Sequence, residues 1–150
     1  MASTVNPSTL TVSLSESITL NGQDMGATNT MSIASVNEVS KRIVTAATDT
    51  NGTEIYKGAA TAGAGQFISA NVKYIRVTNL DDTNYVVLHL QGNAHYVQHK
   101  LEAGKSYVLN TPVGFDNDAD MDDYSAETIT TIQAKAVTAV VDLEVFVASV

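Results

Sequence analysis

The sequence predicts a single all-β domain, an antiparallel β-sandwich with either a jelly-roll or an immunoglobulin-like topology. Hydrophobic and polar residues alternate along nearly the whole chain, and short Gly-, Asn- and Asp-containing turns separate the alternating segments. No stretch has the period of about 3.6 residues that marks a long amphipathic helix. At 150 residues the chain can bury a hydrophobic core within one domain. We therefore expect residues 1–8 to form a short N-terminal arm and residues 9–150 to form the sandwich.

In the N-terminal half, the alternation begins at Leu10 and continues to Leu20. Asn21-Gly22 then marks a tight hairpin turn, because both residues tolerate the positive φ angles that such turns need. Ser35 and Glu38 have the spacing of a helix capping box, so one helical turn near them is the alternative to a strand. The strands expected in this half are residues 10–20, 31–33, 39–46 and 54–57.

In the C-terminal half, a loop rich in glycine and alanine precedes four strands in close succession, which we expect to form an antiparallel meander. The chain ends in a strand, because apolar residues alternate with polar ones almost to the last position. The strands expected in this half are residues 72–77, 85–90, 94–101, 106–109, 128–135 and 139–150. The residues expected to form the core are Leu10, Val12, Leu14, Ile43, Ile75, Val77, Val86, Leu88, Leu109, Val141, Leu143 and Val145.

The composition argues against several classes of function. The net charge is −8 and the eight Lys and Arg residues are scattered, so we expect no nucleic-acid partner, because phosphates attract clustered cations. The chain has no cysteine, so it can form neither disulfides nor thiolate metal sites. The N-terminus does not have the pattern of a secretory signal, and the apolar runs are too short to cross a bilayer. We therefore expect synthesis in the cytoplasm and no membrane partner.

The acidic segment of residues 116–127 is the strongest candidate for a ligand site. Its first, third, fifth and twelfth positions match those of the calcium ligands in an EF-hand-type loop, which wraps Ca²⁺ in oxygen atoms. Met121 stands at the sixth position, where such loops have the glycine of their sharp bend, and no flanking helices are expected. Calcium is therefore one hypothesis, a solvated acidic loop is the alternative, and no other cofactor is predicted. The four candidate ligands are Asp116, Asp118, Asp120 and Glu127.

No combination of residues predicts catalysis. No serine lies in a Gly-x-Ser-x-Gly nucleophile elbow, and we do not expect an acidic loop to hold two carboxylates at the separation that glycoside hydrolysis requires. His95 and His99 lie on one face of an expected strand about 13 Å apart, too far to share a metal ion. We therefore expect a protein that is not an enzyme. Receptor or glycan binding is an alternative function, although the six tyrosines are dispersed along the chain.

Three parts of the chain, taken together, resemble a known family. They are Leu20-Asn-Gly22 with residues 29–44 (NTMSIASVNEVSKRIV), residues 72–84 (VKYIRVTNLDDTN) and residues 141–150 (VDLEVFVASV). These segments resemble the small virion structural proteins of marine tailed bacteriophages, those of cyanobacteria among them, and the similarity covers most of the chain. The resemblance implies a β-sandwich protein located in the virion, and it transfers no functional residues to this chain.

The resemblance and the composition together lead to a specific expectation. A weakly charged, acidic β-sandwich is suited to packing against neighbouring subunits and to staying clear of a packaged genome. We expect a capsid decoration or cement protein on the particle exterior, which forms a homo-oligomer and contacts other virion proteins, in particular the major capsid protein. A neck or tail component of the virion is the alternative within this class.

Overall fold

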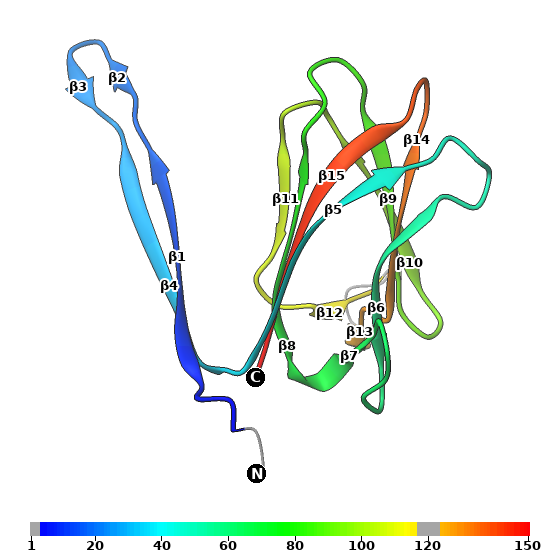
Figure 1. Cartoon of the computed structure of the whole chain (residues 1–150). Helices are drawn as coiled ribbons and strands as arrows, with labels where there is room; N and C mark the ends of the chain where they lie inside the picture. Colours follow the sequence, from blue (N-terminus) through cyan, green and yellow to red (C-terminus); the bar gives the residue numbers. More distant parts are fainter. Residues whose placement is uncertain (1–3, 117–123) are drawn as a thin grey trace.

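The computed structural model describes residues 4–116 and 124–150, which form a β-sandwich with a β-hairpin beside it (Figure 1). Strands dominate the described residues, where the helical structure is a single 3-10 turn, Ser69–Asn71. The helical turn considered near Ser35 does not form, since β4 (Ala27–Val36) and β5 (Glu38–Ala46) occupy that stretch. The all-β class predicted from the alternating pattern is therefore confirmed.

Two sheets pack face to face in the sandwich. The four-stranded sheet contains, in spatial order, β11 (Ser106–Leu109), β8 (Val72–Asn79), β15 (Val141–Ser149) and β5. The five-stranded sheet contains β10 (Tyr96–Leu101), β9 (Val86–Gln91), β14 (Thr131–Ala136), β6 (Thr53–Ala59) and β7 (Phe67–Ile68). The short edge strand β7 runs parallel to β6, whereas the other neighbouring strands are antiparallel.

The order of the strands is that of a jelly roll. When the eight long strands of the two sheets are numbered along the chain, the four-stranded sheet reads 1-8-3-6 and the long strands of the other sheet read 2-7-4-5. This arrangement is two Greek keys wrapped into a double sheet, and it decides between the two topologies that the sequence left open. Viral capsid proteins and lectins share the architecture, so the fold alone assigns no function.

The predicted meander is wrong. β8 and β11 pair with each other in the four-stranded sheet, whereas β9 and β10 pair in the five-stranded sheet. The turns reverse the chain at the expected places, but a turn does not determine whether the next strand stays in the same sheet or crosses to the other one. That choice depends on which apolar faces pack together once both sheets have formed.

The hydrophobic core fills the space between the two sheets. The predicted core residues that are buried are Ile75, Val77, Val86, Leu88, Val141, Leu143 and Val145. Leu10, Val12 and Leu109 are partly buried. The prediction is wrong for Leu14 and Ile43, which have exposed fractions of 63% and 64%. Neither residue faces the core, because Leu14 lies in the hairpin and Ile43 lies on the outer face of the four-stranded sheet.

The first strands of the chain belong to neither sheet of the sandwich. β1 (Ser8–Glu16) pairs with β4, and near the tip β2 (Thr19–Leu20) pairs with β3 (Gln23–Asp24). Together they form a long hairpin that stands beside the sandwich and joins it through Asn37, the one residue between β4 and β5 (Figure 1). Most of the N-terminal segment that the sequence assigned to the sandwich is therefore a projecting element.

Replacing Tyr56 with phenylalanine should leave the free energy of unfolding at pH 7 unchanged or raise it by up to about 1 kcal/mol. Among the described residues, the buried Tyr56 hydroxyl has no hydrogen-bond partner, so the variant removes a polar group that is not satisfied. Burial raises the pKa of Tyr56 to about 12, above its ordinary value of 10.0. The unfolded chain therefore ionises first, and the wild type should lose stability as the pH rises from about 10 towards about 12.

Urea unfolding from pH 7 to pH 11 measures both effects, with Tyr96→Phe, at a tyrosine 55% exposed, as the control. The difference between Tyr56→Phe and the wild type should grow in favour of the variant above about pH 10. A clear loss of stability at pH 7 in Tyr56→Phe would show that the hydroxyl is satisfied after all.

Candidate interaction surface

The β1–β4 hairpin has two chemically different faces. The register places Leu10 opposite Ile33, and it places Val12 opposite Met31 two positions along, so these apolar side chains share one face. On the other face, facing hydroxyl oxygens lie 3.1 Å and 3.3 Å apart in two cross-strand pairs. The residues of this hydroxyl face are Thr11, Ser13, Ser15, Thr28, Thr30 and Ser32.

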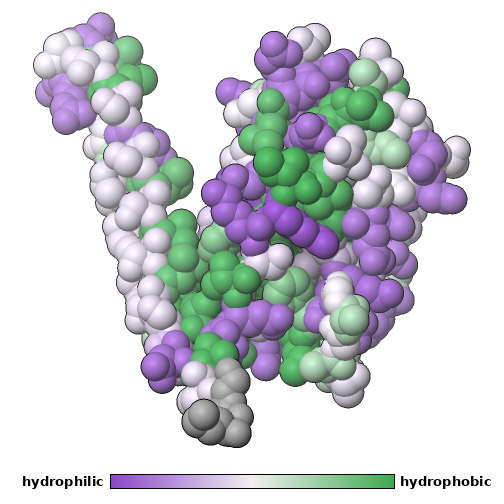
Figure 2. All heavy atoms as spheres, viewed as in Figure 1, coloured by the Kyte–Doolittle hydropathy of each residue, from purple (hydrophilic) through white to green (hydrophobic). Residues whose placement is uncertain are grey.

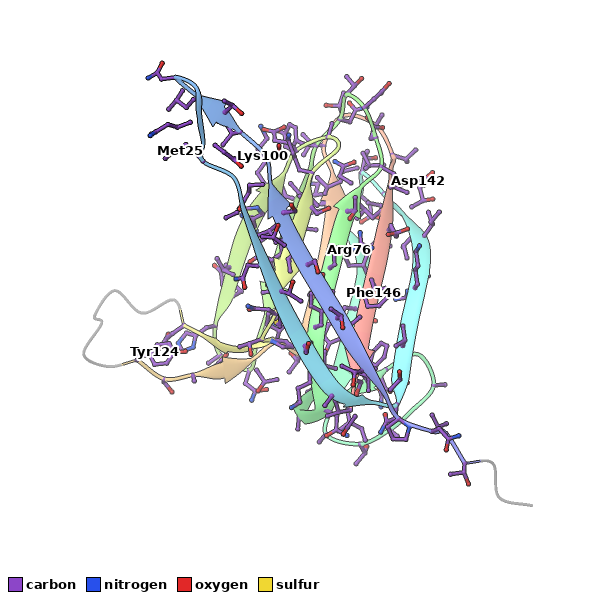
Figure 3. The ribbon with its side chains drawn as sticks, turned by 90° about the vertical axis from the view of Figure 1, so that its left-hand side faces the viewer. Met25, Arg76, Lys100, Tyr124, Asp142 and Phe146 are labelled. Atoms are coloured by element: carbon purple, nitrogen blue, oxygen red, sulfur yellow. The ribbon has the colours of Figure 1, made fainter. Side chains whose placement is uncertain are left out.

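The base of the hairpin packs its apolar face onto the outer face of the four-stranded sheet. Tyr74 and Ala148 of the sheet are buried there together with Val36, and the Tyr74 ring meets the Phe146 ring edge-on with centroids 5.9 Å apart. The hairpin residues that pack against this cluster are Leu10, Val12, Met31 and Ile33. From this contact the hairpin crosses diagonally in front of the sheet (Figure 3).

The distal half of the hairpin leaves its apolar residues uncovered by the part of the chain that the structure describes. Their exposed fractions range from 54% to 63%. Figure 2 shows apolar residues along the side of the hairpin that faces the sandwich, and an open gap between the hairpin tip and the sandwich. The exposed residues are Leu14, Ile18, Leu20 and Met25. Single exposed apolar residues are ordinary, but several on one projecting element indicate an interaction site.

The outer face of the four-stranded sheet is also only partly covered. Val39 and Ile43 on β5 and Val108 on β11 have exposed fractions of 55%, 64% and 50%. The register places Val39 opposite Ala148 and Ile43 opposite Glu144, so both point away from the core. In Figure 3, β5 lies beside the hairpin rather than beneath it. The molecule therefore has two uncovered apolar surfaces on one side, the distal hairpin and the β5 side of the sheet.

A network of charges crosses the same outer face (Figure 3 labels Arg76). Arg76 donates a hydrogen bond of 2.5 Å to Glu144 and another to the Thr78 hydroxyl, and Lys41 lies 3.2 Å from the second oxygen of Glu144. The hydrogen bonds from Arg76 and then from Lys41 hold the pKa of Glu144 below its usual value. The Lys41 side chain remains 61% exposed. This face therefore offers a partner apolar contacts around two cations that share one carboxylate.

The alternating pattern did not predict this surface. Leu14 and Ile43 were expected in the core, because alternation shows which face of a strand is apolar but not what covers that face. One signal was present in the sequence: between residues 8 and 36, Glu16 and Asp24 are the only charged residues. A hairpin whose polar face carries hydroxyls instead of charges is better suited to contact with protein than to isolation in water.

The structure brings together two of the four predicted calcium ligands. Asp116 and Glu127 lie beside His95, whose Nδ1 is 3.7 Å from an Asp116 carboxylate oxygen and 3.3 Å from a Glu127 carboxylate oxygen. Asp118 and Asp120 lie outside the described residues. Within the described ranges, no group of three or more His, Asp or Glu residues is arranged to hold a metal ion. Calcium binding by this segment therefore stays a prediction.

Glu127 has an evident structural role without a metal. It begins the short strand β13 (Glu127–Thr128), which pairs with β12 (Val113–Phe115). Its carboxylate accepts hydrogen bonds from the backbone amides of Ala94 and His95, at 3.0 Å and 3.1 Å. Glu127 therefore ties the turn between β9 and β10 to the end of the acidic segment.

A separate concavity lies on the outer face of the five-stranded sheet. Its volume is about 680 Å³, and amide, hydroxyl and imidazole side chains form much of its lining. His89 in this lining stacks on the Tyr96 ring with centroids 5.1 Å apart. The larger polar residues of the lining are Asn51, His89, Gln98, Gln133 and Lys135. These groups can hydrogen-bond to a polar ligand.

Comparison of the chain with known proteins yields no relative: no protein-family model, no curated protein and no solved structure matches it significantly. The described residues include no helix that is both long and apolar enough to cross a membrane. A functional assignment therefore depends on the surfaces described above.

Proposed function

We propose that this chain is a non-enzymatic structural protein of a bacteriophage virion and decorates the exterior of the capsid. Its partners are other virion proteins, the major capsid protein foremost, and further copies of itself. The observation that carries the proposal is the hairpin, which projects from the sandwich with half of its apolar face uncovered.

The energetics of the hairpin favour a subunit of an assembly. Burial of one large apolar side chain contributes about 1.5–3 kcal/mol, and the distal hairpin keeps four such side chains exposed, Leu14, Ile18, Leu20 and Met25. A catalyst or binding module that acts alone gains nothing from leaving this stabilisation unused. A subunit gains it on assembly, when a neighbour covers the hairpin.

The charge distribution also supports a particle protein. Charged residues make up only 16% of the chain, and the net charge is −8. Few charges have to lose their water when such a surface packs against a neighbour. The negative balance disfavours contact with the genome inside a capsid, which is consistent with a position on the outside.

The number of copies per particle tests this function. Quantitative mass spectrometry of purified particles of the encoding phage should find the chain in an amount on the order of that of the major capsid protein, because a decoration protein follows the capsid lattice. The major capsid protein in the same sample serves as the internal standard.

Two other results would point elsewhere. A single ring of about six to about eighteen copies would identify a neck or tail component, the alternative within the virion. Absence from washed, intact particles would contradict the structural role altogether.

Receptor or glycan binding is the second candidate, and the polar concavity is the observation that favours it. Gln98 on β10 and Gln133 and Lys135 on β14 line it from the two strands that flank β9. Against it, His89, which stacks on Tyr96, is the one aromatic side chain among the described residues of the lining, whereas ligand sites are usually lined by several hydrophobic and aromatic side chains. If the chain is absent from particles, this concavity becomes the leading site.

A further inference from the structure

We infer that the β1–β4 hairpin of one copy packs on the outer face of the four-stranded sheet of a second copy, so that the chain forms a homo-oligomer through its hairpins. The occupant of the two uncovered apolar surfaces is thus another molecule of the same chain. This inference deepens the proposed structural role by naming the partner of the hairpin. It can be tested without particles.

The contact inside the chain shows that the two surfaces are complementary. At the base of the hairpin, Val12 and Met31 already pack on the outer face of the sheet, beside Tyr74 and Ala148. The contact between copies would continue this packing, because it joins the remaining half of the same hairpin face to the remaining part of the same sheet face. No new kind of surface is required.

Each copy has one uncovered surface of each kind, so two copies can cover both surfaces of each other. Each copy has both a donor, the distal hairpin, and an acceptor, the β5 side of the sheet around Val39 and Ile43. A two-fold pair of copies satisfies both surfaces twice, since each hairpin covers the sheet of the other copy. Oligomers commonly form by repeating a contact of this kind.

The charges of the two surfaces are compatible. Between residues 4 and 37, Glu16 and Asp24 are the only charged residues, so the hairpin is slightly negative. The sheet face contains Lys41 and Arg76 around Glu144. Although two copies of net charge −8 repel each other at a distance, the contact itself places an acidic hairpin against a face that contains the exposed Lys41.

The connection between hairpin and sandwich is short and bent. Asn37 is the one residue between β4 and β5. The pairing of β1 with β4 has an irregularity between Ser8 and Leu10, and on β4 Ser35 has a φ of 62°, in the left-handed region that side chains other than glycine seldom adopt. A short, bent connection of this kind is where hairpins exchange between copies.

Sedimentation and light scattering over a range of concentrations should show a wild-type mass of at least twice that of one chain. The triple variant Leu14→Ser, Leu20→Ser, Met25→Ser should raise the dissociation constant at least about tenfold, since each side chain loses apolar burial. The matched control is Val97→Ser, Val137→Ser, Val140→Ser, at apolar residues that are also exposed, by 41%, 45% and 61%, but lie off the hairpin and the four-stranded sheet. This control should associate as the wild type does.

A cross-linking experiment identifies which surfaces meet. The chain contains no cysteine, so a tagged Leu14→Cys copy can be mixed with an untagged Ile43→Cys copy and treated with a short bismaleimide linker. The mixture should yield a product that contains one tagged and one untagged chain. The control mixture of Leu14→Cys with Val97→Cys, on the five-stranded sheet, should yield at least several-fold less of it.

Three results would overturn the inference: a wild type that remains monomeric at every concentration, association that survives the triple hairpin variant, or equal cross-linking in the two mixtures. Because all substituted positions are exposed, the variants should keep the wild-type circular dichroism spectrum. Each of these results is independent of the copy number in particles. A chain that stays monomeric in solution but is present in particles would therefore contradict the pairing and leave the proposed virion role intact. A chain that pairs in solution but is absent from particles would contradict the virion role and leave the pairing intact.

Discussion

Replacing Leu143 with alanine should lower the free energy of unfolding by about 2–5 kcal/mol. Leu143 is fully buried on β15, a central strand that pairs with β5 on one side and β8 on the other. Truncation removes apolar surface from the middle of the core and leaves a cavity that the surrounding strands cannot close, because both neighbours hold β15 in register.

The control for Leu143→Ala is Ile43→Ala, in the adjacent strand. The alternating pattern assigned both residues to the core, but Ile43 is 64% exposed. Urea unfolding at a low protein concentration should show a loss below about 1 kcal/mol for Ile43→Ala. Equal losses for the two variants would mean that the faces of β5 and β15 are assigned wrongly.

Replacing Asn79 with alanine should lower the free energy of unfolding by about 2–4 kcal/mol. The buried Asn79 amide donates hydrogen bonds to the Asn84 and Leu101 carbonyls, at 2.9 Å and 3.3 Å, and accepts one from the Asp81 amide at 2.9 Å. It therefore joins the loop after β8 to the end of β10 in the opposite sheet. Alanine leaves these backbone groups without their partner in a site that excludes most water.

Thermal and urea unfolding of Asn79→Ala should be compared with Asn93→Ala, in an exposed turn, where the loss should stay below about 0.5 kcal/mol. Asn79→Asp tests the direction of the hydrogen bonds, because a carboxylate has no N–H to donate to the two carbonyls. Full stability in Asn79→Asp would contradict the role given to the amide group.

The polar residues that organise the structure were harder to predict than the apolar ones. Asn79 belongs to a turn-like sequence, Asn79-Leu-Asp-Asp-Thr-Asn84, and its composition predicted a turn correctly. Nothing in that sequence shows that the Asn79 side chain is buried and reaches Leu101, since this partner is brought close only by the packing of two sheets. The backbone amides of Ala94 and His95, which donate hydrogen bonds to the Glu127 carboxylate, are distant from Glu127 in the sequence, so they could not be predicted for the same reason.

The sequence by itself determined the class of the fold and most of the strands. Alternation with a period of two is a local property, so it identifies strands such as β8, β9 and β15 and the face of each strand that is apolar. The Asn21-Gly22 turn and the absence of cysteine are equally local, and they gave the hairpin reversal between β2 and β3 and excluded disulfides without reference to any other strand.

Tertiary structure alone decided which strands share a sheet and what covers each apolar face. Leu14 and Leu143 have the same alternating pattern, yet one lies on a projecting hairpin and the other at the centre of the core. The physical reason is that the hydrophobic effect favours burial without specifying the partner, and the partner is chosen by contacts between residues far apart in the chain. The apolar faces of the distal hairpin and of the β5 side of the sheet are not covered by the described residues of the chain, so the partner that covers them has to come from another molecule.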